Sequence, residues 1–130
     1  MRNTLRIGGR RGSQPKAWAV ALVAALFAWA CSDPIAYEEG PLGARRIDRA
    51  FLLDNRGDGA VSYVVVEERT SHVIDLAPCE DWPFLWPGER RLLPFDQVTG
   101  YRPDSLAVFY WCLLDIEGRA FDSGQFMLPF

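Results

Sequence analysis

The stretch AVSYVVVEER, residues 60–69, has the strongest β-strand pattern in the sequence. β-Branched and aromatic residues fill it, and they alternate in two sets: Val61, Tyr63 and Val65 against Ser62, Val64 and Val66. Successive side chains of a strand point to opposite faces of a sheet, so a period of two favours a strand over a helix. This stretch predicts that the chain around it folds as β-sheet.

Further short strands are expected on both sides of this stretch, with turn signals between them. RAFLLDN, residues 49–55, precedes it, and DNRGDGA between the two has the Asn, Asp and Gly that are typical of a hairpin turn. SHVIDLAP at residues 71–78, ERRLLPF at residues 89–95 and GQFMLPF at residues 124–130 have strand-like composition.

A nearly continuous apolar run lies within DSLAVFYWCLLDIEG, residues 104–118. Such a run predicts a central strand, or one that is buried on both faces. After residue 35 no window of eleven or more residues shows a helical period. The predicted fold class is all-β, a small antiparallel β-sandwich of six or seven strands.

This series of short strands resembles immunoglobulin-like and fibronectin-like β-sandwiches at the level of architecture. Immunoglobulin domains pair cysteines about twice as far apart as Cys79 and Cys112, with a tryptophan well after the first cysteine. Here Trp111 directly precedes Cys112, so the two side chains point to opposite faces. The resemblance therefore implies the architecture and not membership of the family.

The N-terminal 31 residues have the order of a targeting segment, a basic region followed by an uncharged apolar region. The apolar part is AWAVALVAALFAWAC, residues 17–31, and it ends in Ala28-Trp29-Ala30-Cys31, which fits an A-x-A cleavage site. It also resembles a bacterial lipoprotein signal, in which the cysteine becomes the lipidated N-terminus. That resemblance implies cleavage or lipidation at Cys31.

Three outcomes for this segment remain open: a cleaved lipoprotein, an uncleaved single-span anchor and plain secretion. Fifteen helical residues rise about 22 Å, which is less than the hydrocarbon core of about 30 Å. Each outcome places residues 34–130 on the extracytoplasmic (periplasmic) side of a bacterial membrane. The expected organisation is a signal or membrane anchor at residues 1–31, a tether at residues 32–46 and a β-sandwich domain at residues 47–130.

The charge distribution narrows the possible partners, and the number of cysteines predicts a disulfide. Five of the 14 basic residues and no acidic residue lie in residues 1–30, which leaves nine basic residues against 17 acidic ones in the remainder. An acidic domain repels phosphate backbones, so nucleic acid is not an expected partner. Once Cys31 is set aside, Cys79 and Cys112 form an even pair, which predicts one disulfide in an oxidising compartment.

No set of residues points to catalysis. Arg56-Gly57-Asp58 reads as a turn. A calcium loop is not expected there, because Arg56 would occupy the position of a calcium ligand. His72 is the only histidine, so a zinc site lacks ligands, and the carboxylates of Glu67 and Glu68 point to opposite strand faces and read as solvated charges. The sequence therefore predicts neither an enzyme nor a cofactor site.

CEDWPFLWPGERRLLPF, residues 79–95, is unexpectedly rich in aromatic residues for a connection between strands. It can be interpreted as a lid on one end of the sandwich, or as an exposed patch that docks on another protein or on lipid headgroups. The candidate interface residues are Trp82, Phe84, Trp86, Arg90, Arg91, Phe126 and Phe130.

These observations favour a non-catalytic, membrane-anchored domain that acts as a structural or docking subunit of a larger bacterial membrane complex, for example a respiratory or photosynthetic one. The alternative is a free-standing envelope lipoprotein that binds a ligand or an envelope component in a cleft of the sandwich.

Overall fold

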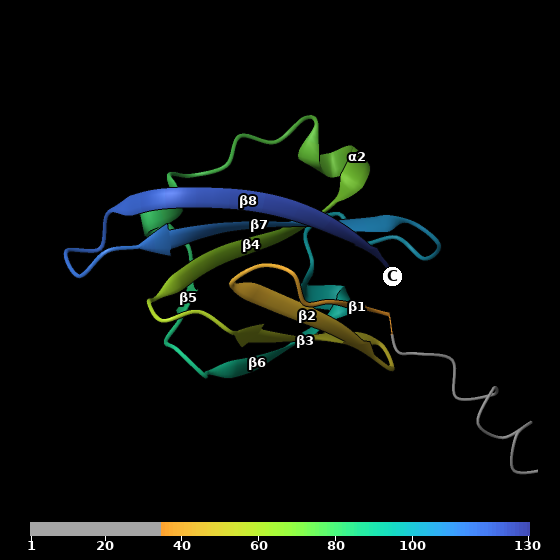
Figure 1. The fold of residues 1–130 in the computed structure, drawn as a ribbon. Coiled ribbons are helices and arrows are strands. Elements are labelled where there is room, and N and C mark those ends of the chain that lie inside the picture. The colour runs from red at the N-terminus through yellow and green to blue at the C-terminus, as the bar shows by residue number, and fades with distance from the viewer. Residues whose placement is uncertain (1–34) are drawn as a thin grey trace, which may run out of the picture. The chain divides into compact units, whose positions relative to one another are not determined.

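The computed structural model describes residues 35–130, which form two antiparallel sheets of four strands each (Figure 1). The first sheet has the order β1-β2-β3-β6 and the second β5-β4-β7-β8. The strands of the first sheet are β1 (Ala36–Tyr37), β2 (Leu42–Ile47), β3 (Ala50–Asn55) and β6 (Arg90–Pro94). The strands of the second are β5 (Phe84–Leu85), β4 (Val61–Glu67), β7 (Leu106–Leu114) and β8 (Ala120–Pro129). The predicted all-β sandwich is confirmed, although the described residues form eight strands and not the six or seven expected.

An aromatic core fills the space between the two sheets. Phe51 on β3 is fully buried, and its ring centroid lies 4.8 Å from that of Phe95 and 4.9 Å from that of Phe109. Phe126 stacks on Phe109 with centroids 4.7 Å apart. Each buried aromatic side chain removes a large apolar area from water, so these contacts bring the two sheets together.

Strand β7 lies between β4 and β8 and is buried on both faces, as its apolar run predicted. Ala107 and Phe109 face the core between the sheets, whereas Val108 and Cys112 are buried on the outer face. Trp111 packs against the core, on the face opposite Cys112. Its ring lies so close to Gly124 on β8 that a side chain at that position would collide with it.

A cover segment, residues 68–83, lies across the outer face of β4 and β7 (Figure 1). It begins with the short helix α2 (Glu68–Ser71) and ends with the 3-10 turn η1 (Cys79–Asp81), and both contact the two strands. The prediction of a strand at residues 71–78 is wrong, because this part of the cover segment passes over the face of the sheet and does not pair along its edge. A further 3-10 turn, η2 (Phe95–Gln97), follows β6.

The predicted hairpin around residues 56–59 is also wrong, although the turn itself is present. β3 and β4 belong to different sheets, so this turn carries the chain from one sheet to the other. The side chain of Asn55 is buried and holds the crossing, because its amide donates to the carbonyl oxygens of Gly59 at 2.7 Å and Leu85 at 2.9 Å. Its Oδ1 accepts from the amide of Gly57.

The expected tether at residues 32–46 is wrong from residue 36 onward. Strands β1 and β2 lie in this range, and β2 pairs with β3 from Leu42 to Ile47. Leu42 and Ala44 are buried in the core, which requires this segment to belong to the domain. The signal or anchor segment and the predicted site at Cys31 lie outside the described residues. Within residues 35–130 there is no helix with the length and apolar character needed to cross a membrane.

Candidate functional site

A groove of about 390 Å³ opens at the end of the sandwich where β4 begins and β7 ends. One wall comes from β5 and the residues after it, and the other from the turn between β7 and β8. The apolar lining residues are Ala60, Phe84, Trp86, Pro87, Leu114 and Ile116, and the charged ones are Asp58, Glu80 and Asp115. Apolar walls with a few polar groups are typical of binding sites.

Phe84 and Trp86 form an exposed aromatic pair in this groove. Leu85 between them is fully buried beside Val61, so the alternation of the strand turns its two neighbours outward. Phe84 is 41% and Trp86 62% exposed, and their rings meet edge to face with centroids 5.2 Å apart. The exposed-patch interpretation fits these two residues.

The backbone holds the pair in place. The amide of Trp86 donates to the carboxylate of Glu89 at 2.9 Å, and the amide of Gly88 donates to the carbonyl oxygen of Asn55 at 3.0 Å. Gly88 has φ of 76°, a conformation that residues with a side chain rarely adopt. The aromatic pair therefore projects from a fixed turn.

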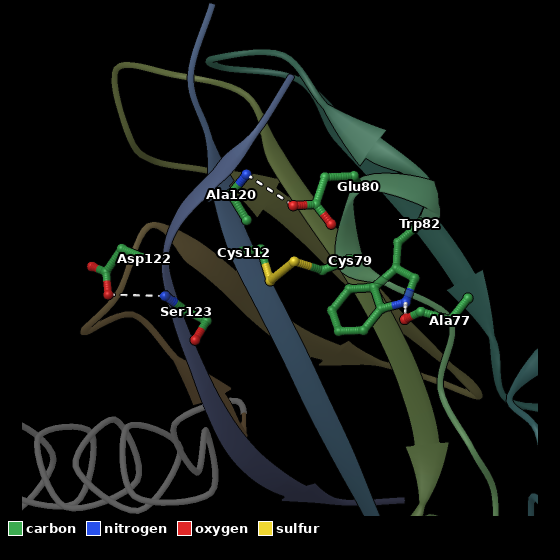
Figure 2. Close-up of a disulfide and its surroundings, with 8 residues drawn as sticks. All are labelled: Ala77, Cys79, Glu80, Trp82, Cys112, Ala120, Asp122 and Ser123. Atoms are coloured by element: carbon green, nitrogen blue, oxygen red, sulfur yellow. Dashed lines mark hydrogen bonds between the residues drawn. A yellow bond between two sulfur atoms is a disulfide. The ribbon is translucent and has the colours of Figure 1, made fainter. Parts of the chain in front are cut away.

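Trp82 has a different role from Phe84 and Trp86. Its indole N–H donates to the carbonyl oxygen of Ala77 at 2.8 Å, and its half-buried ring lies beside the cysteine pair (Figure 2). It belongs to the cover segment and packs on the outer face of the sheet. Trp82 is therefore part of a lid, but this lid covers a sheet face and not one end of the sandwich as predicted.

Arg91 lies beside the groove and is tied to the sandwich. It donates to the hydroxyl of Tyr63 at 3.0 Å and pairs with Glu89 at 3.1 Å. The hydrogen bond to Tyr63 raises the pKa of Arg91 above its ordinary value. Arg90 is exposed on the edge strand β6.

Phe126 and Phe130 do not belong to an exposed surface, so their prediction as interface residues is wrong. They are 8% and 7% exposed and lie in the core. Phe126 stacks between Phe109 and Tyr37, and Phe130 packs against Phe95 at a centroid distance of 5.2 Å. Even-numbered residues of β8 face the core here, which explains the burial of Phe126 and Leu128.

Cys79 and Cys112 lie at disulfide distance, with Cα atoms 6.3 Å apart (Figure 2). The pair joins the cover segment to the outer face of β7. The next residue, Glu80, accepts a hydrogen bond from the amide of Ala120 at 3.2 Å and so links the cover segment to β8 as well. Glu80 reaches the groove, so the cover segment supplies part of the groove lining.

Glu67 was expected to be a solvated charge, and this expectation is wrong. Its side chain is 1% exposed and accepts from the amide of Thr70 at 3.0 Å, from the hydroxyl of Thr70 at 3.1 Å and from Arg102 at 3.1 Å. Burial raises the pKa of Glu67, but the hydrogen bonds from Thr70, Arg102 and Arg69 outweigh it and lower the pKa to about 2. This carboxylate caps α2, so its role is structural.

The remaining candidate groups form no metal-binding cluster within the described residues. His72 is exposed at the end of α2. Among residues 35–130 no three side chains of His, Cys, Asp or Glu lie close enough together to bind a metal ion. The expectation that the protein is not an enzyme stays a prediction.

Comparison of the chain with protein-family models, with curated proteins and with solved structures gave no match. The function is therefore inferred from the residues that line the groove.

Proposed function

We propose that this protein is a non-catalytic docking domain, held at the extracytoplasmic face of a bacterial membrane by its N-terminal segment. It binds a protein subunit of a larger membrane complex through the groove around Phe84 and Trp86. The observation that carries this proposal is the aromatic pair, which is exposed on a turn whose backbone is held by hydrogen bonds. Tryptophan in such a position is typical of residues that dominate the binding energy of protein interfaces.

The position of the groove supports a protein partner over lipid headgroups. The carbonyl oxygen of Ile35 accepts from the amide of Arg46 at 2.8 Å, so the chain joins the sandwich at the end where β2 finishes. The groove lies at the opposite end, and the seven residues of β4 separate the two by roughly 20 Å. A domain anchored through its N-terminal segment would present this groove away from the bilayer.

Purification of the tagged full-length chain in mild detergent tests the proposal. A protein subunit should copurify in a fixed ratio, and Trp86→Ala should release it because the indole fills the interface. Met127→Ala is the matched control, since Met127 is exposed on β8 outside the groove. Circular dichroism confirms that both variants fold. A monomeric chain without a stoichiometric partner, or unchanged retention of Trp86→Ala, would contradict docking through this groove.

A free-standing lipoprotein that binds a small ligand is the second candidate. The groove volume of about 390 Å³ favours it, because small-molecule sites have a volume of roughly 300–1,000 Å³. Native mass spectrometry separates the two: a retained small molecule on a monomeric chain supports the ligand, and a retained subunit supports docking.

A further inference from the structure

We propose that the groove selects a cationic, apolar segment of its partner, in which large apolar side chains alternate with Lys or Arg. This inference rests on the proposed docking function and adds the chemistry of the partner. Its basis is the combination of apolar walls with a rim of one charge sign.

The walls provide the apolar half of the site. Phe84 and Trp86 line it from the side of β5, and Ile116, which is fully exposed, lines it from the turn between β7 and β8. Leu114 is a further lining residue and is buried. An apolar side chain placed between these walls would remove all three exposed surfaces from water at once, which favours a partner with large aliphatic or aromatic residues.

The rim provides the charged half. Asp58, Glu80 and Asp115 line the groove, and none of the described lining residues is a lysine or an arginine. Arg119, in the turn next to the groove, pairs with Glu117 at 3.1 Å. The groove therefore carries an uncompensated negative charge.

Two of these carboxylates are fixed by the fold. Glu80 accepts from the amide of Ala120, and Oδ1 of Asp115 accepts from the amides of Glu117 and Arg119, both at 2.9 Å. Amide donors hold the carboxylates at the rim without neutralising their charge. A Lys or Arg of the partner could pair with them while its neighbouring apolar residue enters the groove.

The same negative charge disfavours a second copy of this chain and an anionic lipid surface as occupants of the groove. A second copy would bring one acidic domain against another, because the chain after residue 30 has 17 acidic residues against nine basic ones. An anionic lipid surface would meet the acidic rim with like charge. A cationic segment meets complementary charge, and it is the occupant that we propose.

Three synthetic hexapeptides test the inference, with Leu and Phe at alternate positions and Lys, Glu or Ser between them. Each is titrated by biolayer interferometry against the immobilised full-length chain in detergent, with a micelle-only reference surface. The Lys peptide should bind at least about tenfold more tightly than the Glu peptide, since several rim charges contribute a modest free energy each. Equal affinity for the two peptides would overturn the inference.

A charge-matched pair of double variants locates the effect. Asp58→Asn with Glu80→Gln keeps an acceptor oxygen at both positions and removes two rim charges, so Lys-peptide binding should weaken roughly three- to tenfold. Asp48→Asn with Asp96→Asn removes two charges next to β2 and β6 at the end remote from the groove, and should leave binding unchanged. Equal loss in both double variants would reduce the effect to net charge and overturn a groove-specific preference.

Trp86→Ala distinguishes failure of this inference from failure of the proposed function. It should weaken the Lys and Ser peptides alike by roughly tenfold or more, because it removes the apolar wall. Dependence on Trp86 without charge preference would leave docking standing and overturn the cationic partner. Independence from Trp86 would overturn both. Binding to phosphatidylglycerol vesicles or self-association that is lost in Trp86→Ala would identify a different occupant and overturn the inference too.

Discussion

Glu67 illustrates how local sequence can mislead about a charged residue. It follows six residues of strand pattern and precedes Glu68, so it has the pattern of a charge at the solvated end of a strand. In the folded chain it lies on the core side of β4, where its Oε2 accepts from Thr70 and Arg102. Burial of a charge is tolerable only when its hydrogen bonds are made, and here the start of α2 provides them.

This environment predicts a specific dependence of stability on pH. The pKa of Glu67 is about 2 in the folded state, against an ordinary value of 4.5. Folding therefore favours the ionised form, so its contribution to stability is fully present above pH 4.5 and is lost as the pH falls from 4.5 toward 2. We expect Glu67→Gln to lower stability at pH 7 and to flatten the acid limb of the stability curve.

Urea denaturation at a series of pH values from 2.5 to 7 measures this effect. Glu39→Gln serves as the control, because Glu39 is exposed and precedes β2. The control should follow the wild-type curve. An acid limb with the same slope in wild type and Glu67→Gln would show that another carboxylate is responsible.

At the scale of the element, the strands that the sequence predicts are those whose pattern is long. β4 and β7 are recognisable because they alternate or run apolar over seven and nine residues. β1 has two residues, and β2 contains Gly43, Arg45 and Arg46, so neither has a pattern that resembles a core strand. Their assignment depends on pairing with β3, which is a tertiary contact that local sequence does not encode.

The residues of the candidate site also fall into those that the sequence predicts and those that only the fold reveals. Phe84 and Trp86 are prominent by composition, and the buried Leu85 between them fixes their outward direction. FMLPF, residues 126–130, has apolar residues at both odd and even positions. Its parity relative to the core therefore cannot be read from the sequence, which is why the prediction of Phe126 and Phe130 as interface residues is wrong. The acidic rim combines three segments distant in sequence, which only the fold brings together.

The cover segment yields a prediction at this scale. Cys79 and Cys112 tie it to β7, and their sequence separation is 33 residues. Replacement of both, as Cys79→Ser with Cys112→Ala, should lower the free energy of unfolding by about 3–4 kcal/mol, because the unfolded chain loses a constraint on a long loop. Hydrogen exchange should accelerate first in residues 68–83, while β3 and β6 in the opposite sheet remain protected.

The reducing agent tris(2-carboxyethyl)phosphine is the control for this prediction. It should destabilise the wild type and leave the double variant unchanged, since the variant has no pair to reduce. Equal sensitivity of the two chains, or uniform exchange across both sheets, would show that the cysteine pair does not hold the cover segment in place.

At the scale of the whole molecule, the position of β1 shortens the connection to the N-terminal segment. Four residues, 32–35, remain between Cys31 and β1, and they span at most about 14 Å when extended. An anchored chain would therefore hold the sandwich close to the bilayer by the end at which Ile35 pairs with Arg46. Under the proposed function, Ile47 would lie near the headgroups and Ile116 far from them.

A fluorescent coumarin amino acid at either position tests this orientation. Ile47 and Ile116 are both exposed, so neither replacement disturbs the core. With the full-length chain in nanodiscs that carry nitroxide-labelled headgroups, we expect strong quenching at position 47 and weak quenching at position 116, because β4 separates the two ends by roughly 20 Å. Intact mass of the same sample establishes whether Cys31 is N-terminal and lipidated. Equal quenching at both positions would mean that the groove also faces lipid. Stronger quenching at position 116 would reverse the proposed orientation, and the groove would then face lipid and not a protein partner.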